Sequence, residues 1–180
     1  MKLSVPKETK HKENRVALTP DVVKGLVSKG FEVMVEKDAG KNSFYTDDAY
    51  TAAGAAIVDL NKCYTDADVV LKVNAPLPDE ISKMKKESIL ISFMWATTNP
   101  LLVDACVNAG ISAFSMDAIP RISRAQKMDA LSSQANLAGY KAVILAANAL
   151  GKIFPMMTTA AGTIRPSKVV IFGAGVAGLQ

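Results

Sequence analysis

Residues 168–178 read KVVIFGAGVAG, an apolar run followed directly by closely spaced glycines. Apolar residues 169–172 favour a β-strand and run directly into Gly173, Gly175 and Gly178, which match the pattern GxGxxG. The pattern is weak alone and more specific directly after a strand. Its first glycine permits a tight turn, its second lets a phosphate approach the backbone, and its third lets the next helix pack closely. The sequence therefore favours a dinucleotide-binding turn over a glycine-rich loop without a ligand.

The expected binding positions cover the whole turn: Gly173, Ala174, Gly175, Val176, Ala177 and Gly178. The acidic residue that holds the adenosine ribose is expected about 20 residues further on. That position lies beyond Gln180, as do the remaining strands of the sheet. The choice between NAD and NADP is therefore not readable from this turn.

Upstream of the turn, apolar runs alternate with helical patterns. Strands are expected at residues 3–5, 31–36, 56–58, 69–73, 88–93 and 111–114, and helices at 20–29, 45–54, 99–109 and 131–150. Strands separated by helices favour a parallel sheet with right-handed crossovers. The expected fold is α/β: a parallel Rossmann-like sheet with flanking helices, a long connecting helix, and the first strand and turn of a second Rossmann domain.

Three segments follow from this pattern. Residues 1–130 are expected to form an N-terminal α/β domain, and 131–163 a long linking helix with a connector. Residues 164–180 are expected to begin a truncated dinucleotide-binding domain. The segment 154–163 is uncharged and is interpreted as irregular.

Composition excludes several classes of function. A net charge of +4 with few aromatic residues argues against nucleic-acid binding. Two distant cysteines and a single histidine, His11, do not provide a zinc site, so no metal is expected. No apolar run reaches the roughly 18–20 residues of a membrane span, and the N-terminus does not resemble a signal peptide.

A dense polar segment precedes the long helix. Residues 120–140 read PRISRAQKMDALSSQANLAGY. A capped helix start, with Asp129 or Ser132 bonded to free N–H groups, explains one or two of these residues. It does not explain Arg121, Gln126, Asp129 and Ser132 together. A cation, an amide, a carboxylate and a hydroxyl suit the binding of a carboxamide and a ribose, which favours a site over a simple connector.

Three stretches carry a family resemblance. Residues 120–143 resemble the signature loop and helix of the proton-translocating nicotinamide nucleotide transhydrogenases, and residues 154–180 resemble their entry into the NAD-binding domain. Residues 6–20, PKETKHKENRVALTP, are similar to an opening shared with alanine dehydrogenases. The resemblance covers essentially the whole chain.

The resemblance implies site residues and partners. The family's catalytic loop falls on Arg121, Gln126, Asp129 and Ser132, with Ile122 and Ser123 as further cofactor contacts. In that family the arginine and aspartate position the nicotinamide and ribose of NAD(H), and the glutamine meets NADP(H) held by a partner domain. The implied assembly is a homodimer with NADP(H)-binding and membrane domains, on the cytoplasmic side of the membrane or in the mitochondrial matrix.

Alanine dehydrogenase is the nearest alternative. That family binds a 2-oxo acid with an arginine and a lysine, which match Arg15 and Lys72, and uses a histidine as acid and base. Here the corresponding segment reads Ser92-Phe93-Met94-Trp95-Ala96 and lacks the histidine. Amino-acid oxidation needs a group that titrates near neutrality, whereas direct hydride exchange between two nicotinamides does not. Arg15 and Lys72 are then interpreted as structural remnants. A role as surface or sheet-edge charges explains them at least as well as any function does.

A third alternative is a scaffold or dimerising module without activity. Residues 1–130 are able to fold without a cofactor. The 180-residue chain alone is expected to be inactive and to bind NAD(H) weakly or not at all, because the strand at 169–172 lacks its neighbours.

Overall fold

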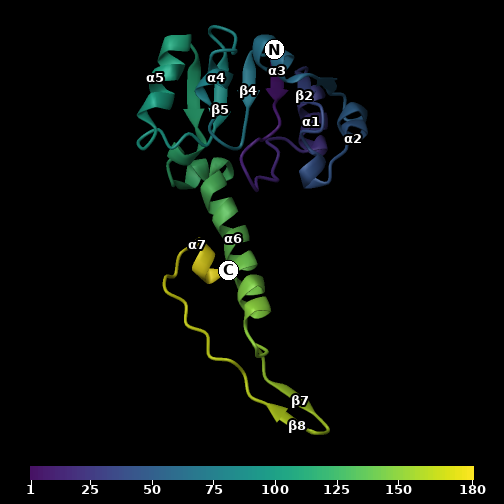
Figure 1. Cartoon of the computed structure of the whole chain (residues 1–180), viewed down its shortest axis with the longest axis vertical. Helices are drawn as coiled ribbons and strands as arrows, with labels where there is room; N and C mark the ends of the chain where they lie inside the picture. Colours follow the sequence, from purple (N-terminus) through teal and green to yellow (C-terminus); the bar gives the residue numbers. More distant parts are fainter. The chain divides into compact units, whose positions relative to one another are not determined.

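The computed structural model describes all residues, Met1–Gln180, which divide into two units, Met1–Ile119 and Pro120–Gln180 (Figure 1). The predicted scheme of 1–130, 131–163 and 164–180 remains a prediction. Each unit is described by itself.

The first unit is built on one parallel six-stranded sheet with the strand order β3-β2-β1-β4-β5-β6. Its strands are β1 (Lys2–Val5), β2 (Glu32–Glu36), β3 (Ala56–Val58), β4 (Val69–Leu71), β5 (Ile89–Ser92) and β6 (Ser112–Ser115). Its α-helices are α1 (Pro20–Val27), α2 (Asp47–Ala52), α3 (Leu60–Thr65), α4 (Pro78–Ile81) and α5 (Pro100–Ala109), with 3-10 turns at Lys41–Ser43 and Met116–Ala118. The expected parallel Rossmann-like sheet with flanking helices is confirmed.

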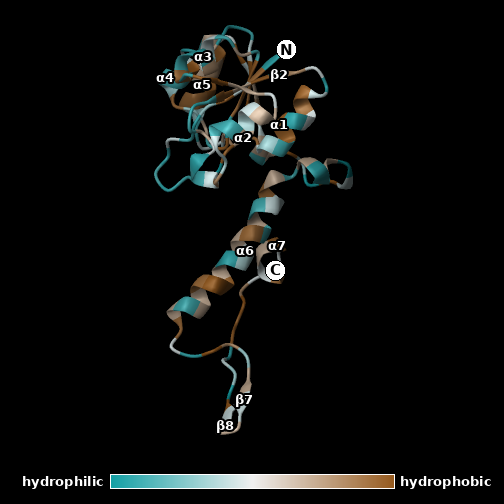
Figure 2. Cartoon of the chain, turned by 90° about the vertical axis from the view of Figure 1, so that its right-hand side faces the viewer, coloured by the Kyte–Doolittle hydropathy of each residue, from teal (hydrophilic) through white to brown (hydrophobic).

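Alternating side chains give the sheet a core on each face. In β2, Val33 and Val35 pack with Val23 of α1 and Tyr50 of α2, whereas Met34 packs on the opposite face with residues of α3, α4 and α5. Successive strand side chains point to opposite faces of the sheet. The apolar residues of a run such as EVMVE therefore contribute to the cores on both faces. Brown segments mark apolar residues of both strands and helices in Figure 2.

Two short helices, α3 and α4, were not predicted from the sequence. Helix α3 begins at an Asp59 cap, whose carboxylate accepts the Lys62 N–H at 3.0 Å. Helix α4 begins where the Glu80 carboxylate accepts the Leu77 N–H at 2.7 Å. Helices of six and four residues are too short to display a period of 3.6 residues, and local caps hold them.

The second unit contains the long helix α6 (Ala130–Ala149), preceded by a 3-10 turn (Ser123–Met128) and followed by α7 (Val176–Leu179). The predicted long helix is confirmed. Residues 154–163 are not wholly irregular, since β7 (Met157–Thr159) and β8 (Gly162–Ile164) form an antiparallel hairpin. None of the helices combines the length and apolar composition that a membrane crossing requires.

The expected strand over Val169–Phe172 does not form. These four side chains are exposed, Phe172 by 96%. A strand needs a neighbour to satisfy its N–H and C=O groups, and no other strand lies beside this segment. The prediction from the apolar run was therefore wrong for this chain.

Candidate functional site

The glycine-rich turn has the backbone geometry that its pattern requires. Gly173 has a φ of +113°, a backbone conformation that residues other than glycine rarely adopt. A Cβ on Gly178 would lie 2.1 Å from the carbonyl oxygen of Gly173, so only glycine fits there. Gly175 precedes α7 and has no atom within 4 Å of a built Cβ. The backbone at Gly175 is therefore open to a ligand.

Asp129 and Ser132 form the start of α6. One oxygen of the Asp129 carboxylate accepts the Ser132 N–H at 2.9 Å, and the other accepts the Ser132 hydroxyl at 2.6 Å. These hydrogen bonds from Ser132, together with the charge of Arg121, lower the pKa of Asp129. The capping role considered from the sequence is thus present. It keeps Asp129 ionised and fixes the Ser132 hydroxyl.

Residues of both predicted motifs, the polar segment before α6 and the glycine-rich turn, line a cavity of about 340 Å³ within the second unit. Its lining comprises Arg121, Leu131, Ser132, Ala135, Phe172, Gly173, Gly175, Val176, Ala177 and Gly178. Arg121 and Ser132 therefore face the same space as the glycine-rich turn, although 41 residues separate Ser132 from Gly173 in the sequence. The volume lies at the lower end of the range for ligand sites, roughly 300–1,000 Å³.

The other predicted residues do not line this cavity. Asp129 contacts Ser132 but is itself outside the lining, as is Ala174 of the turn. Ile122, Ser123 and Gln126 are exposed. Leu131 and Ala135 were not singled out from the sequence. Their signal was the spacing of three and four residues that places Leu131, Ser132 and Ala135 near one another on a helix.

A second cavity, of about 420 Å³, lies in the first unit where β1, β4 and β5 end. Its lining comprises Glu8, Thr9, Lys10, Lys72, Asn74, Ala75, Leu77, Glu80, Phe93, Trp95 and Asn99. The strand order reverses between β1 and β4, and the carboxyl ends of strands at such a point commonly bind ligands.

Lys72 in this cavity is buried, with 2% of its side chain exposed. Its ammonium lies 3.0 Å from a Glu80 oxygen, which also accepts the Tyr64 hydroxyl at 2.6 Å. Burial alone would raise the pKa of Glu80, but bonds from Tyr64 and Leu77 and the charge of Lys72 lower it. The interpretation of Lys72 as a surface or sheet-edge charge was wrong. The signal for its partner was present, because a lysine in the apolar run VVLKV requires a counter-ion.

The same cavity contains a carboxylate that sequence reasoning missed. Glu8 accepts the Val73 N–H at 2.6 Å and the Asn74 side-chain amide at 3.1 Å. Arg15, the other residue considered as a substrate contact, lies against Glu13 at 2.7 Å. The hydrogen bond from Arg15 is the largest of the effects that together lower the pKa of Glu13 to about 2.

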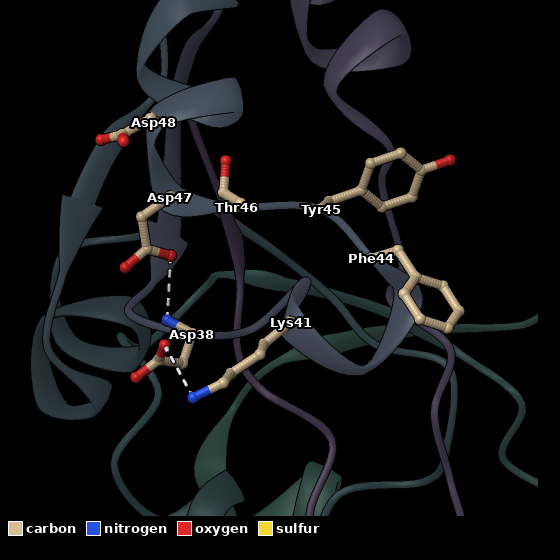
Figure 3. Close-up of a pocket in the computed structure, with 7 residues that line it drawn as sticks. All are labelled: Asp38, Lys41, Phe44, Tyr45, Thr46, Asp47 and Asp48. Atoms are coloured by element: carbon tan, nitrogen blue, oxygen red, sulfur yellow. Dashed lines mark hydrogen bonds and ion pairs between the residues drawn. The ribbon is translucent and has the colours of Figure 1, made fainter.

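A third cavity, of about 420 Å³, lies beside α2 and is drawn in Figure 3. Two of its carboxylates already have local partners: Asp47 accepts the Asp38 N–H at 3.0 Å, and Asp38 lies 4.0 Å from the Lys41 ammonium. Phe44 is 96% exposed at its edge. These interactions hold a loop and assign no ligand to the cavity.

Comparison with known proteins gives the family. Residues 4–138 match the model of the alanine dehydrogenase/PNT N-terminal domain, and residues 142–180 match that of the C-terminal domain. The chain is 50% identical to an NAD(P) transhydrogenase alpha-subunit protein of Rhodospirillum rubrum, over 100% of the chain and 48% of that protein. It is 34% identical to the alanine dehydrogenase of Bacillus subtilis, over 99% of the chain and 47% of that protein.

A solved structure of transhydrogenase from Sinorhizobium meliloti superposes with a TM-score of 0.96 at 45% identity, covering 99% of this chain and 54% of the other. The chain spans about half the length of these relatives. The relatives named transhydrogenase are more similar to it than the alanine dehydrogenase. On the match to both domain models, the chain belongs to the alanine dehydrogenase/PNT family.

Proposed function

We propose that this chain supplies the NAD(H)-binding part of a nicotinamide nucleotide transhydrogenase, which exchanges a hydride between NAD(H) and NADP(H). One observation carries the proposal: Arg121 and Ser132 line the same cavity as the glycine-rich turn. The open backbone at Gly175 and the left-handed Gly173 suit a pyrophosphate, and the cation of Arg121 suits a phosphate, amide or ribose oxygen.

The chain's own groups bind and orient in this proposal. A bound nicotinamide supplies the hydride chemistry, and the protein contributes position and the exclusion of water. Asp129 accepts the Ser132 hydroxyl at 2.6 Å, which holds this polar group in one direction at the cavity wall. Direct hydride exchange requires no proton acceptor, which agrees with a cavity that contains no histidine.

Amino-acid oxidation remains the second candidate, and the cavity around Lys72 is the observation that favours it. Two features oppose it. Lys72 is already paired with Glu80, and Trp95 occupies the segment where an acid/base histidine is expected. The chain's single histidine, His11, lines neither of these cavities.

The deciding experiment uses the full-length protein that carries this sequence, assembled with its partner subunits. We expect hydride transfer from NADH to an NADP⁺ analogue, and no NADH oxidation with pyruvate and ammonia. Oxidation of NADH by pyruvate and ammonia, without transfer between nucleotides, would refute the proposal in favour of amino-acid chemistry.

The assignments of partner, coupling and oligomeric state rest on the resemblance to the same family. We propose that a partner domain presents NADP(H), that the assembly couples transfer to proton translocation at the cytoplasmic or matrix face of a membrane, and that the protein is a homodimer. The exposed apolar side chains of the second unit, among them Leu137, Ile171 and Phe172, support a covering partner.

The isolated 180-residue chain is expected to bind NADH weakly. The segment at 169–172 has no neighbouring strand. No sheet therefore fixes the start of the turn that follows it. Calorimetric titration of NADH into this chain and into a longer chain that completes the domain measures the difference. Micromolar binding by the short chain at one site would contradict this expectation.

A further inference from the structure

Gly139 is the one buried residue of the 20-residue helix α6. A Cβ built on it would lie 2.3 Å from the carbonyl oxygen of Ala177 and 3.0 Å from its carbonyl carbon. Side-chain carbons do not approach backbone oxygens so closely. Only glycine therefore permits the observed contact between α6 and α7, which lie side by side in Figures 1 and 2.

Helix stability does not account for a glycine at this position. Glycine inside a helix is less favourable than alanine. Gly139 is not among the glycines with a positive φ, so its backbone freedom is not used. Gly25, inside α1, differs from Gly139 because a Cβ built on it would have no atom within 4 Å. The close approach is the feature that requires Gly139.

The contact lies on the face of α6 that lines the cavity. Ser132 and Ala135 precede Gly139 by seven and four residues, the spacing of one helix face, and both line the cavity together with Ala177. The backbone contact at Gly139 thereby sets the separation between the α6 face and the glycine-rich turn.

We propose that Gly139 is a positioning residue of the dinucleotide site, which fixes the distance between Ser132 on α6 and the turn at Gly173–Gly178. This inference rests on the proposed function. NADH has to contact both sides of the cavity at once, because its pyrophosphate belongs to the turn and its nicotinamide half to the Arg121 side. A ligand that carries only the adenosine half does not depend on the separation.

The test compares Gly139→Ala with Gly25→Ala in the full-length protein that carries this sequence. A methyl at residue 139 displaces the Ala177 carbonyl by roughly 1 Å, since carbon–oxygen contacts lie near 3.3 Å. We expect Gly139→Ala to raise the Kd for NADH on the order of 10- to 100-fold, and the Kd for AMP much less. Gly25→Ala leaves both unchanged. NADH fluorescence and calorimetry measure the two ligands, and circular dichroism establishes folding.

The outcomes separate positioning from a general structural role. Unchanged NADH binding in folded Gly139→Ala overturns the inference, and so does an equal loss of NADH and AMP binding. If Gly139→Ala does not fold, Ala135→Leu places a larger side chain on the same α6 face of the cavity and should weaken NADH binding more than AMP binding. Equal binding of NADH by Ala135→Leu and the unsubstituted protein then overturns the inference. Absence of NADH binding in the unsubstituted protein refutes the proposed function itself.

Discussion

Replacement of Arg121 by alanine is expected to slow hydride transfer on the order of 100-fold in the full-length, assembled protein. Arg121 lines the cavity beside the glycine-rich turn, so its loss removes the cation proposed to contact the dinucleotide. Single-turnover transfer from NADH to an NADP⁺ analogue measures the effect. Arg124→Ala is the matched control, because that exposed arginine does not line the cavity.

Asp129→Asn completes this test. Asparagine caps helices about as well as aspartate, so α6 keeps its first turn while the carboxylate charge is lost. Transfer should slow in this variant with little change in unfolding free energy. Unchanged rates in both Arg121→Ala and Asp129→Asn would remove these residues from the site.

Glu80→Gln is expected to lower the unfolding free energy by about 3–5 kcal/mol. The substitution keeps an acceptor for the Tyr64 hydroxyl and removes the negative charge beside buried Lys72. Lys72 is then left charged without an anionic partner in a low-dielectric environment. Urea denaturation of the single variant and of Lys72→Met/Glu80→Gln measures this, and the double variant should recover most of the loss. Equal losses in both variants would show that the charge pair is not the cause.

The same pair predicts a pH dependence. The pKa of Glu80 is lowered below its ordinary 4.5 in the folded state. Its contribution to stability is therefore fully present above about pH 4.5 and is lost as pH falls through the folded pKa. The double variant should lose less stability than the unsubstituted protein across this acidic window, as judged by urea midpoints at several pH values.

Apolar periodicity predicted the sheet because strands such as β2 have side chains packed in a core on each face. Val33 and Met34 illustrate this, since adjacent residues enter opposite cores. The same reasoning failed at 169–172, where the pattern is as strong but no strand lies beside it. A strand pattern records propensity, whereas a strand exists only when its hydrogen bonds find partners.

The polar motifs were visible in the sequence, but their arrangement was not. The pattern around Gly173 and the segment at Arg121 each indicated binding by residue type. Their shared cavity depends on a backbone contact between Gly139 and Ala177, which no local pattern encodes. Likewise, the Lys72 run showed that a counter-ion was needed, and only the fold identified it as Glu80.

The strand order has a consequence for truncation. Residues 2–5 form β1, which pairs with β2 on one side and β4 on the other. Deleting these four residues would not trim an edge but would divide the sheet into a two-stranded and a three-stranded piece. A tag fused ahead of Met1, by contrast, leaves every pairing of β1 in place. The very beginning of the chain therefore tolerates extension and does not tolerate shortening.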